Sequence, residues 1–410
     1  MNFRIAITFM LICLIPGGFL IGTLSSYGYQ SIASMIPVLR VILLGISLMF
    51  AFFRIQQITI TRLQAFFLLF YAVYYVYAFY YIQIAPEVPR ADMLDVPPDN
   101  SVLYRDFLIQ TVAVLLVGFY RKFIDFTLFA KVTTIVVAIL FFFYYSQVGF
   151  ASYGIEDMYD NKLFSDEQVI VSFRLARYFA IGFFCCLACK SLWFKSKTMN
   201  IVLTYMAAAI LLTGLILTVK RGPILSLFVT TLYWYFIKSK SSHIIRSLLL
   251  WGFVILFFGN ILADFIENYM GGLAERIENT VDDGGSGRFG SSTSVFALSL
   301  RQIAEDPLLG SYFRITNGLG LGSHPHNFIL EMLMTFGLVF TTIFVPLFWN
   351  IFKRINMLIR TNSSNTLAAT CFLYVFCASM TSGSVFLNTE FWIFLSILCS
   401  YEIIYEKKII

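Results

Sequence analysis

Apolar runs of about 20 residues, the length that crosses the hydrocarbon core of a lipid bilayer, recur along the whole chain. Hydrophobic residues occupy 59% of the 410 positions and charged residues 13%, well below the roughly 25% of a soluble domain. This pattern predicts an all-α polytopic membrane protein with about 12 transmembrane helices. The runs lie near residues 5–24, 35–53, 63–84, 103–119, 126–146, 168–189, 200–219, 222–237, 247–264, 326–349, 366–382 and 390–404.

Basic residues indicate the orientation of these spans. If the N-terminus is cytoplasmic, the inner segments hold most of the Lys and Arg, which is the bias seen in membrane proteins. Both termini are therefore expected in the cytoplasm. The short outer loops hold few basic residues: Arg90, Arg105, Lys162, Lys220 and Arg221.

The longest polar segment, residues 265–325, divides the chain into spans one to nine (1–264) and spans ten to twelve (326–410). We expect one membrane domain with a large outer loop, and loops of this length are usually functional. Inside the loop, "SSTSVFALSLRQIAEDPLLG" begins with Ser/Thr helix-start signals and stops at Asp306-Pro307. It predicts a short amphipathic helix lying on the outer membrane surface or over the bundle. The apolar residues at helical spacing are Val295, Phe296, Leu300, Ile303 and Ala304.

Charged residues inside predicted spans mark candidate functional positions, because burying charge in lipid is costly. Arg174 and Arg177 are three residues apart and share a helix face, where they suit a phosphorylated lipid head. The alternatives are a structural pair with Glu331 or Glu390, or a head that reaches the surface. Arg40 and Lys131, which are isolated, are expected to be structural.

Lys220 and Arg221 fill a very short outer hairpin in "LTVKRGPILSL", against the general charge bias of the chain. Pro223 favours the first turn of the following helix, whose free N–H groups would help to bind an anion there. Arg288 lies among glycines in "DDGGSGRFGSS", and a guanidinium on such a loop suits a phosphate. The alternative for the hairpin is a solvated turn. No metal or cofactor site is expected.

Two of the three histidines flank Pro325 in "SHPHN", at the outer start of span ten. A neutral imidazole can accept a proton from a hydroxyl, so His326 is a candidate general base, or else a cap or interfacial residue. Asn327 is expected to orient a sugar or to cap the helix. Glu331 follows on the same helix face and is a candidate substrate-binding residue. His324 is expected at the rim.

Several outer cations and one histidine fit transfer chemistry on a phosphate-activated substrate without a metal. "PHNFILEMLMTFG" resembles the signature of the O-antigen polymerase and O-antigen ligase superfamily, His-Asn followed nine residues later by Gly, here His326, Asn327 and Gly337. "KRGPIL" is similar to its Arg-x-x-x-Leu element. "GSGR" and "DPLLG" are similar to its large periplasmic loop. The likeness covers roughly residues 200–350.

The resemblance implies a GT-C membrane glycosyltransferase of the bacterial inner membrane, with its active site on the periplasmic face. The donor would be an undecaprenyl-diphosphate-linked saccharide, and the reaction inverting and metal-independent. The family's essential residues carry over to Arg221, Arg288 and His326, with Lys220, Arg174, Arg177, Asn327 and Glu331 as candidate substrate-binding residues. A chain-length regulator and a flippase are candidate partners, whereas nucleic acid is not.

The assignment to the polymerase or the ligase branch of the superfamily rests on weaker signals. Phe340 stands where ligases usually have a small residue or Tyr, and Glu331 resembles polymerases. Polymerase is therefore the favoured reading, and a ligase that passes the glycan to lipid A core is the alternative. A flippase for lipid-linked sugars is a third reading, but it should hold its charges along a central path.

Overall fold

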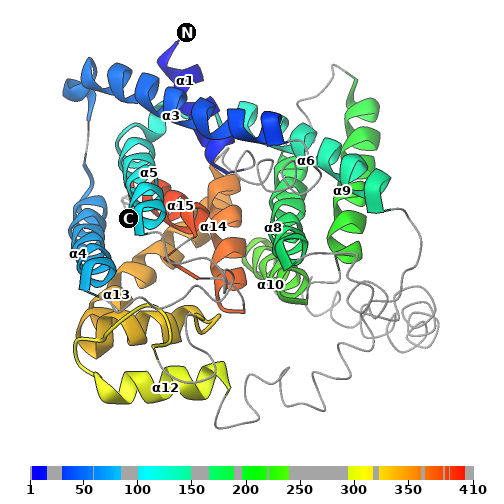
Figure 1. Ribbon diagram of the computed structural model, residues 1–410. Coiled ribbons are helices and arrows are strands. Elements are labelled where there is room, and N and C mark those ends of the chain that lie inside the picture. Colours follow the sequence, from blue (N-terminus) through cyan, green and yellow to red (C-terminus); the bar gives the residue numbers. More distant parts are fainter. Residues whose placement is uncertain are drawn as a thin grey trace, which may run out of the picture.

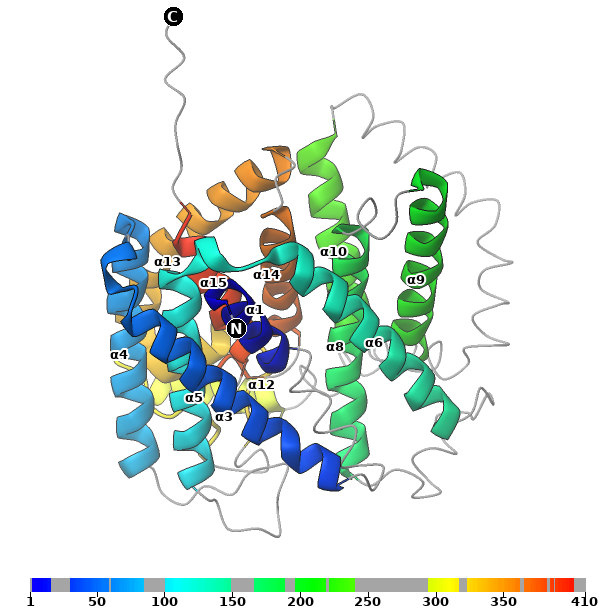
Figure 2. The same cartoon turned by 90° about the horizontal axis from the view of Figure 1, so that it is seen from above.

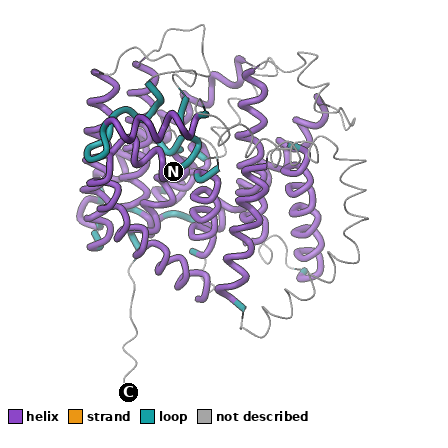
Figure 3. Tube along the Cα trace, turned by 90° about the horizontal axis from the view of Figure 1, so that it is seen from below, coloured by secondary structure: helices purple, strands orange, loops and turns teal. Residues whose placement is uncertain are grey.

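The structure is a computed structural model, and it describes residues 2–15, 30–58, 60–84, 100–148, 166–188, 196–218, 221–239, 294–316, 323–361, 365–381, 384–386 and 388–401. These residues form helices joined by loops and turns, with no strand among them (Figure 3). The helices are α1 (Phe3–Leu14), α3 (Gln30–Phe52), α4 (Arg62–Ile84), α5 (Asn100–Phe119), α6 (Phe126–Val148), α8 (Asp166–Ala188), α9 (Lys197–Leu217), α10 (Arg221–Lys238), α12 (Val295–Glu305), α13 (Phe328–Thr361), α14 (Thr366–Ser379) and α15 (Thr389–Cys399).

The core of the described bundle is built on α14 and α15. Figures 1 and 2 show α13, α14 and α15 in the middle of the bundle. Helices α4 and α5 lie on one side of this group, and α8, α9 and α10 lie on the other. In α15 every residue from Phe391 to Cys399 is fully buried, and α14 is buried along most of its length. A helix that is apolar on all faces needs neighbours on all faces, which accounts for its central place.

The all-helical class is confirmed for the described residues. Within the described ranges, two helices are long and apolar enough, by length and composition, to cross a membrane: Lys197–Ile216 and Phe328–Thr361. Other predicted runs coincide with helices, and the run at 247–264 lies outside the described residues. The number of spans, the orientation and the division at residues 264 and 325 stay predictions.

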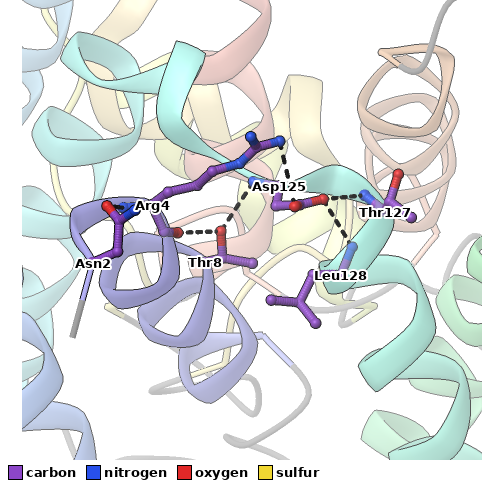
Figure 4. Close-up of polar contacts among 6 residues, drawn as sticks. All are labelled: Asn2, Arg4, Thr8, Asp125, Thr127 and Leu128. Atoms are coloured by element: carbon purple, nitrogen blue, oxygen red, sulfur yellow. Dashed lines mark hydrogen bonds and ion pairs between the residues drawn. The ribbon is translucent and has the colours of Figure 1, made fainter.

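Polar contacts tie the N-terminal helix to the start of α6 (Figure 4). Arg4 forms an ion pair of 3.3 Å with Asp125, whose Oδ1 also accepts the N–H groups of Thr127 and Leu128 and so caps α6. The hydroxyl of Thr8 accepts the N–H of Asp125 at 3.0 Å. These bonds satisfy the first N–H groups of α6, which have no partner within the helix.

Arg40 closes the other end of α1. Its guanidinium on α3 donates to the carbonyl oxygens of Cys13 at 2.9 Å and Leu14 at 3.3 Å. A cation at a helix C-terminus binds carbonyls that lack an intrahelical partner. The structural role expected for Arg40 is therefore confirmed.

The helix α13 is broken at Gly337, where φ is 61° and ψ is −170°. The segment Pro307–Ser311 fills the break with backbone hydrogen bonds: Leu338 N–H donates to Pro307 O at 2.8 Å, and Ser311 N–H donates to Met334 O at 2.7 Å. The N-terminal piece of α13, residues 328–336, thus lies beside α12, as the yellow and orange ribbons of Figure 1 show. The single span predicted at 326–349 is therefore interrupted. Residues 328–336 and residues 338–361 form two separate helical rods.

Candidate active site

The amphipathic helix predicted in the outer loop is present as α12. The Ser294 hydroxyl accepts the N–H of Ala297 at 3.2 Å and starts the helix, which ends before Asp306. Its buried face, however, is made by Ser299 and Gln302, while Leu300 is 55% exposed. Of the apolar residues at helical spacing, Val295, Phe296 and Ile303 are partly buried, whereas the neighbouring loop takes its hydrogen-bond partners from the buried polar face.

Gln302 organises the loop that follows α12. Its Nε2 donates to the Ser311 hydroxyl at 3.0 Å, to Tyr312 O at 3.0 Å and to Arg314 O at 3.1 Å. Its Oε1 accepts the N–H of Thr316 at 3.1 Å. One buried amide therefore satisfies backbone groups along residues 311–316, which would be costly to bury without partners.

The histidine segment is anchored to this loop. Ile315 N–H donates to Ser323 O at 2.8 Å, immediately before His324. Pro325 is buried, and His326 has φ of 52°, in the left-handed region. The rings of His324 and His326 lie 4.3 Å apart between centroids, with their planes inclined by 61°. His324, expected as a rim residue, is therefore in contact with the candidate base.

Asn327 caps α13, one of the two roles expected for it. Its Oδ1 accepts the N–H groups of Ile329 at 3.0 Å and Leu330 at 3.1 Å. Its Nδ2 donates to the carbonyl of Met380, just beyond α14, at 3.1 Å. The amide thus fixes the start of α13 against the end of α14, next to His326.

Glu331, one helical turn further in, is completely buried. Its carboxylate accepts hydrogen bonds from the Ser384 hydroxyl and, at 2.8 Å, from the N–H of Val385. The guanidinium of Arg314, which is 5% exposed, interacts electrostatically with the same carboxylate. Burying a carboxylate without partners is costly, and the hydrogen bonds from Ser384 and Val385 offset part of that cost for Glu331.

Aromatic rings close the space around this charge pair. The ring of Phe386 stacks on Phe313 at 4.9 Å and on Tyr74 at 5.0 Å. The hydroxyl of Tyr74 donates to the carbonyl of Phe386 at 3.3 Å. Water is thereby kept away from Glu331, so that its interaction with Arg314 is less screened than it would be at the surface.

The two span arginines lie on α8. Arg177 is partly buried and interacts electrostatically with Tyr374 of α14. The Glu390 carboxylate accepts a hydrogen bond from Tyr178, the chain neighbour of Arg177. Glu331 and Glu390 are the two carboxylates expected as alternative partners of these arginines. Glu390 accepts the bond from Tyr178, and Glu331 accepts hydrogen bonds from Ser384 and Val385. The side chain of Arg174 lies outside the described residues.

The remaining predicted site residues are placed only in part. Arg221 is the first residue of α10, as expected from the turn signals, but its side chain is not described. Lys220 and Arg288 lie outside the described residues. The convergence of these cations on His326 stays a prediction, whereas His326, Asn327 and Glu331 do lie together at the start of α13.

Sequence reasoning missed Arg314 and Ser384. Arg314 stands between apolar neighbours in "SYFRIT", and a cation flanked by buried aromatic and aliphatic residues was a usable signal of a buried charge. Ser384 follows α14 in a short Ser/Gly-rich turn, and nothing in that turn distinguishes a carboxylate ligand from a loop residue.

Comparisons with known proteins add no relative. The chain matches no known family model and no curated protein sequence. Over the described residues, the fold defines an all-helical protein with two candidate membrane-spanning helices.

Proposed function

We propose that the chain is a membrane glycosyltransferase that polymerises undecaprenyl-diphosphate-linked repeat units into O-antigen or a related surface polysaccharide. The observation that supports this most is the folding of two signature segments into one unit. The segment "DPLLG" fills the break at Gly337, and the helix so shaped begins at Phe328, directly after His326 and its capping residue Asn327. The nine-residue spacing of the signature thus has a structural reason.

In the proposed reaction, His326 takes the proton from the attacking hydroxyl of the incoming repeat unit. The hydroxyl oxygen bonds to the anomeric carbon of the growing chain, on the face opposite the leaving group. The bond from that carbon to the diphosphate breaks, and the electron pair leaves on the diphosphate oxygen. Inversion at the anomeric carbon follows from this single displacement.

The cations would stabilise the charge that develops on the leaving group. Arg221 and Arg288 hold the departing diphosphate, with Lys220 beside them, since guanidinium groups bind phosphate oxygens in pairs. Arg174 and Arg177 hold the lipid carrier or the glycan. The Glu331 carboxylate is fully buried. It therefore contributes by holding the start of α13 in place.

A deletion strain tests the proposal against its alternative. Loss of a polymerase should leave single repeat units on the lipid A core, whereas loss of a ligase should leave the core bare. A normal ladder of chain lengths after deletion would contradict both. Complementation with His326→Ala should then fail at normal protein level, and full-length product from that variant would remove His326 from the role of base.

Arg221→Lys and Arg288→Lys refine the same test. Each substitution keeps the positive charge and removes the paired N–H groups. Polymer should fall strongly in both, and the complementing gene with Lys353→Arg, on the predicted cytoplasmic side, serves as the matched control. Unchanged polymer from both variants would separate these arginines from diphosphate binding.

A further inference from the structure

The backbone at His326 is in an unusual conformation. Among the residues that the structure describes, it is the one non-glycine residue with positive φ. A side chain in this region costs free energy relative to an ordinary conformation, and such strain persists where the surroundings hold it. The surroundings of His326 therefore hold its backbone in this conformation.

The segment that holds His326 is fixed at both ends. Ser323 O accepts the N–H of Ile315, and Asn327 is bound both to the first turn of α13 and to Met380. Between these anchors, Pro325 is buried and limits the backbone of His324. The backbones of His324 and His326 are therefore held in place from both sides, and in this arrangement their two rings are in contact.

The ring geometry itself suggests what His324 does. The centroids are 4.3 Å apart and the planes are inclined by 61°, so the edge of one ring meets the face of the other. An aromatic face attracts a cation, and an imidazole becomes a cation when it accepts a proton. An edge-to-face neighbour both restricts ring rotation and stabilises that cation.

We propose that His324 is a positioning residue for His326, an inference that rests on the proposed function. Its ring fixes the direction of the His326 ring and stabilises the imidazolium that His326 becomes in the transition state. In this step the hydroxyl proton moves to His326 and remains there. His324 neither gains nor loses a proton, so what it contributes is an aromatic face.

Two substitutions at His324 distinguish a role of its aromatic ring from a role of its proton-accepting nitrogen atoms. His324→Phe keeps an aromatic face and has no nitrogen, and His324→Leu removes both. With purified full-length enzyme and lipid-linked repeat units, we expect His324→Leu to lower kcat about tenfold with KM unchanged. His324→Phe should recover kcat to within about threefold of wild type. The matched controls are the same changes at the third histidine, His243, which the sequence places in an inner segment.

The outcomes that overturn the inference are equally specific. If His324→Phe is as slow as His324→Leu, the ring nitrogens of His324 are required, and positioning by its aromatic face is wrong. If neither variant changes kcat, the ring contact has no part in catalysis. Thermal unfolding of each variant checks that the fold is retained.

A second variant keeps this test distinct from that of the proposed function. When His324→Leu is added to His326→Ala, it should cause no further loss, because the residue that it positions is gone. A further loss would overturn the inference while leaving His326 as base. Full activity of His326→Ala alone would instead contradict the proposed function itself.

Discussion

Gly310 and Gly337 lie backbone against backbone. A Cβ atom on Gly310 would stand 2.5 Å from the amide nitrogen of Gly337, and one on Gly337 would stand 2.6 Å from that of Gly310. Both residues also have positive φ, 75° and 61° respectively. Both positions therefore require glycine. A Cβ atom at either one would overlap the backbone of the other, and both have a positive φ that favours glycine.

Alanine at either glycine should unfold this junction. We expect Gly310→Ala and Gly337→Ala each to destabilise the protein by about 2–4 kcal/mol, through steric overlap and backbone strain. Thermal unfolding in detergent measures the loss. Gly45→Ala is the matched control, because a Cβ at Gly45 meets nothing within 4 Å. Equal melting temperatures for all three variants would contradict the close approach.

Arg314 and Glu331 should be coupled in stability. Arg314→Met and Glu331→Gln each leave a partner charge buried, which typically costs about 3–5 kcal/mol. The double variant should regain most of that loss, since neither charge remains. A double-mutant cycle on unfolding free energies gives the coupling.

The exposed pair Arg301 and Glu305 provides the control for that cycle. Their atoms lie 3.8 Å apart, and the side chains are 80% and 52% exposed. Pairs of this kind contribute about 0–1 kcal/mol. A coupling between Arg314 and Glu331 as small as that of the surface pair would show that the buried charges are not partners.

Gln302→Leu should loosen residues 311–316. The change leaves several buried backbone groups without partners, and each unsatisfied group costs about 1–3 kcal/mol. Hydrogen exchange of the 311–316 amides, read by mass spectrometry, should become faster. Leu300→Gln on the exposed side of α12 should leave exchange unchanged. Slow exchange in Gln302→Leu would mean that other contacts hold the loop.

Asn327 can be tested for its two expected roles separately. Asn327→Ala should cost about 1 kcal/mol through loss of the helix cap. Asn327→Ser keeps a capping oxygen and should recover most of that stability, although it cannot donate to Met380. If Asn327→Ser is stable and still has a raised KM, the amide also binds sugar. Normal KM would leave the cap as its only role.

The helices near the site were predictable where local chemistry decides the structure. Ser294 and Asp306-Pro307 mark the ends of α12, and Asn327 marks the start of α13, because capping depends on one side chain and its nearest amides. Arg221, followed by Gly and Pro, similarly marks the start of α10. The patterns responsible lie within a few residues of the boundaries they predict.

The break at Gly337 was not predictable from hydropathy. Residues 326–349 are apolar throughout, so the window reads as one span, and the break depends on a segment nearly 30 residues earlier in the chain. The burial of Gln302 in place of Leu300 has the same origin, since it is set by backbone groups of residues 311–316. Backbone hydrogen bonds between segments far apart in the sequence produce no periodic pattern of side chains in either segment.

The break in α13 also separates two helical phases. Along a continuous α-helix, inserting one residue rotates everything beyond it by about 100°. Because Gly337 interrupts the ladder, the angular setting of residues 338–361 does not have to continue that of residues 328–336. Asn327 and Glu331 can thus remain bonded to Met380 and Ser384 while residues 338–361 turn their side chains in directions that one continuous helix would not allow.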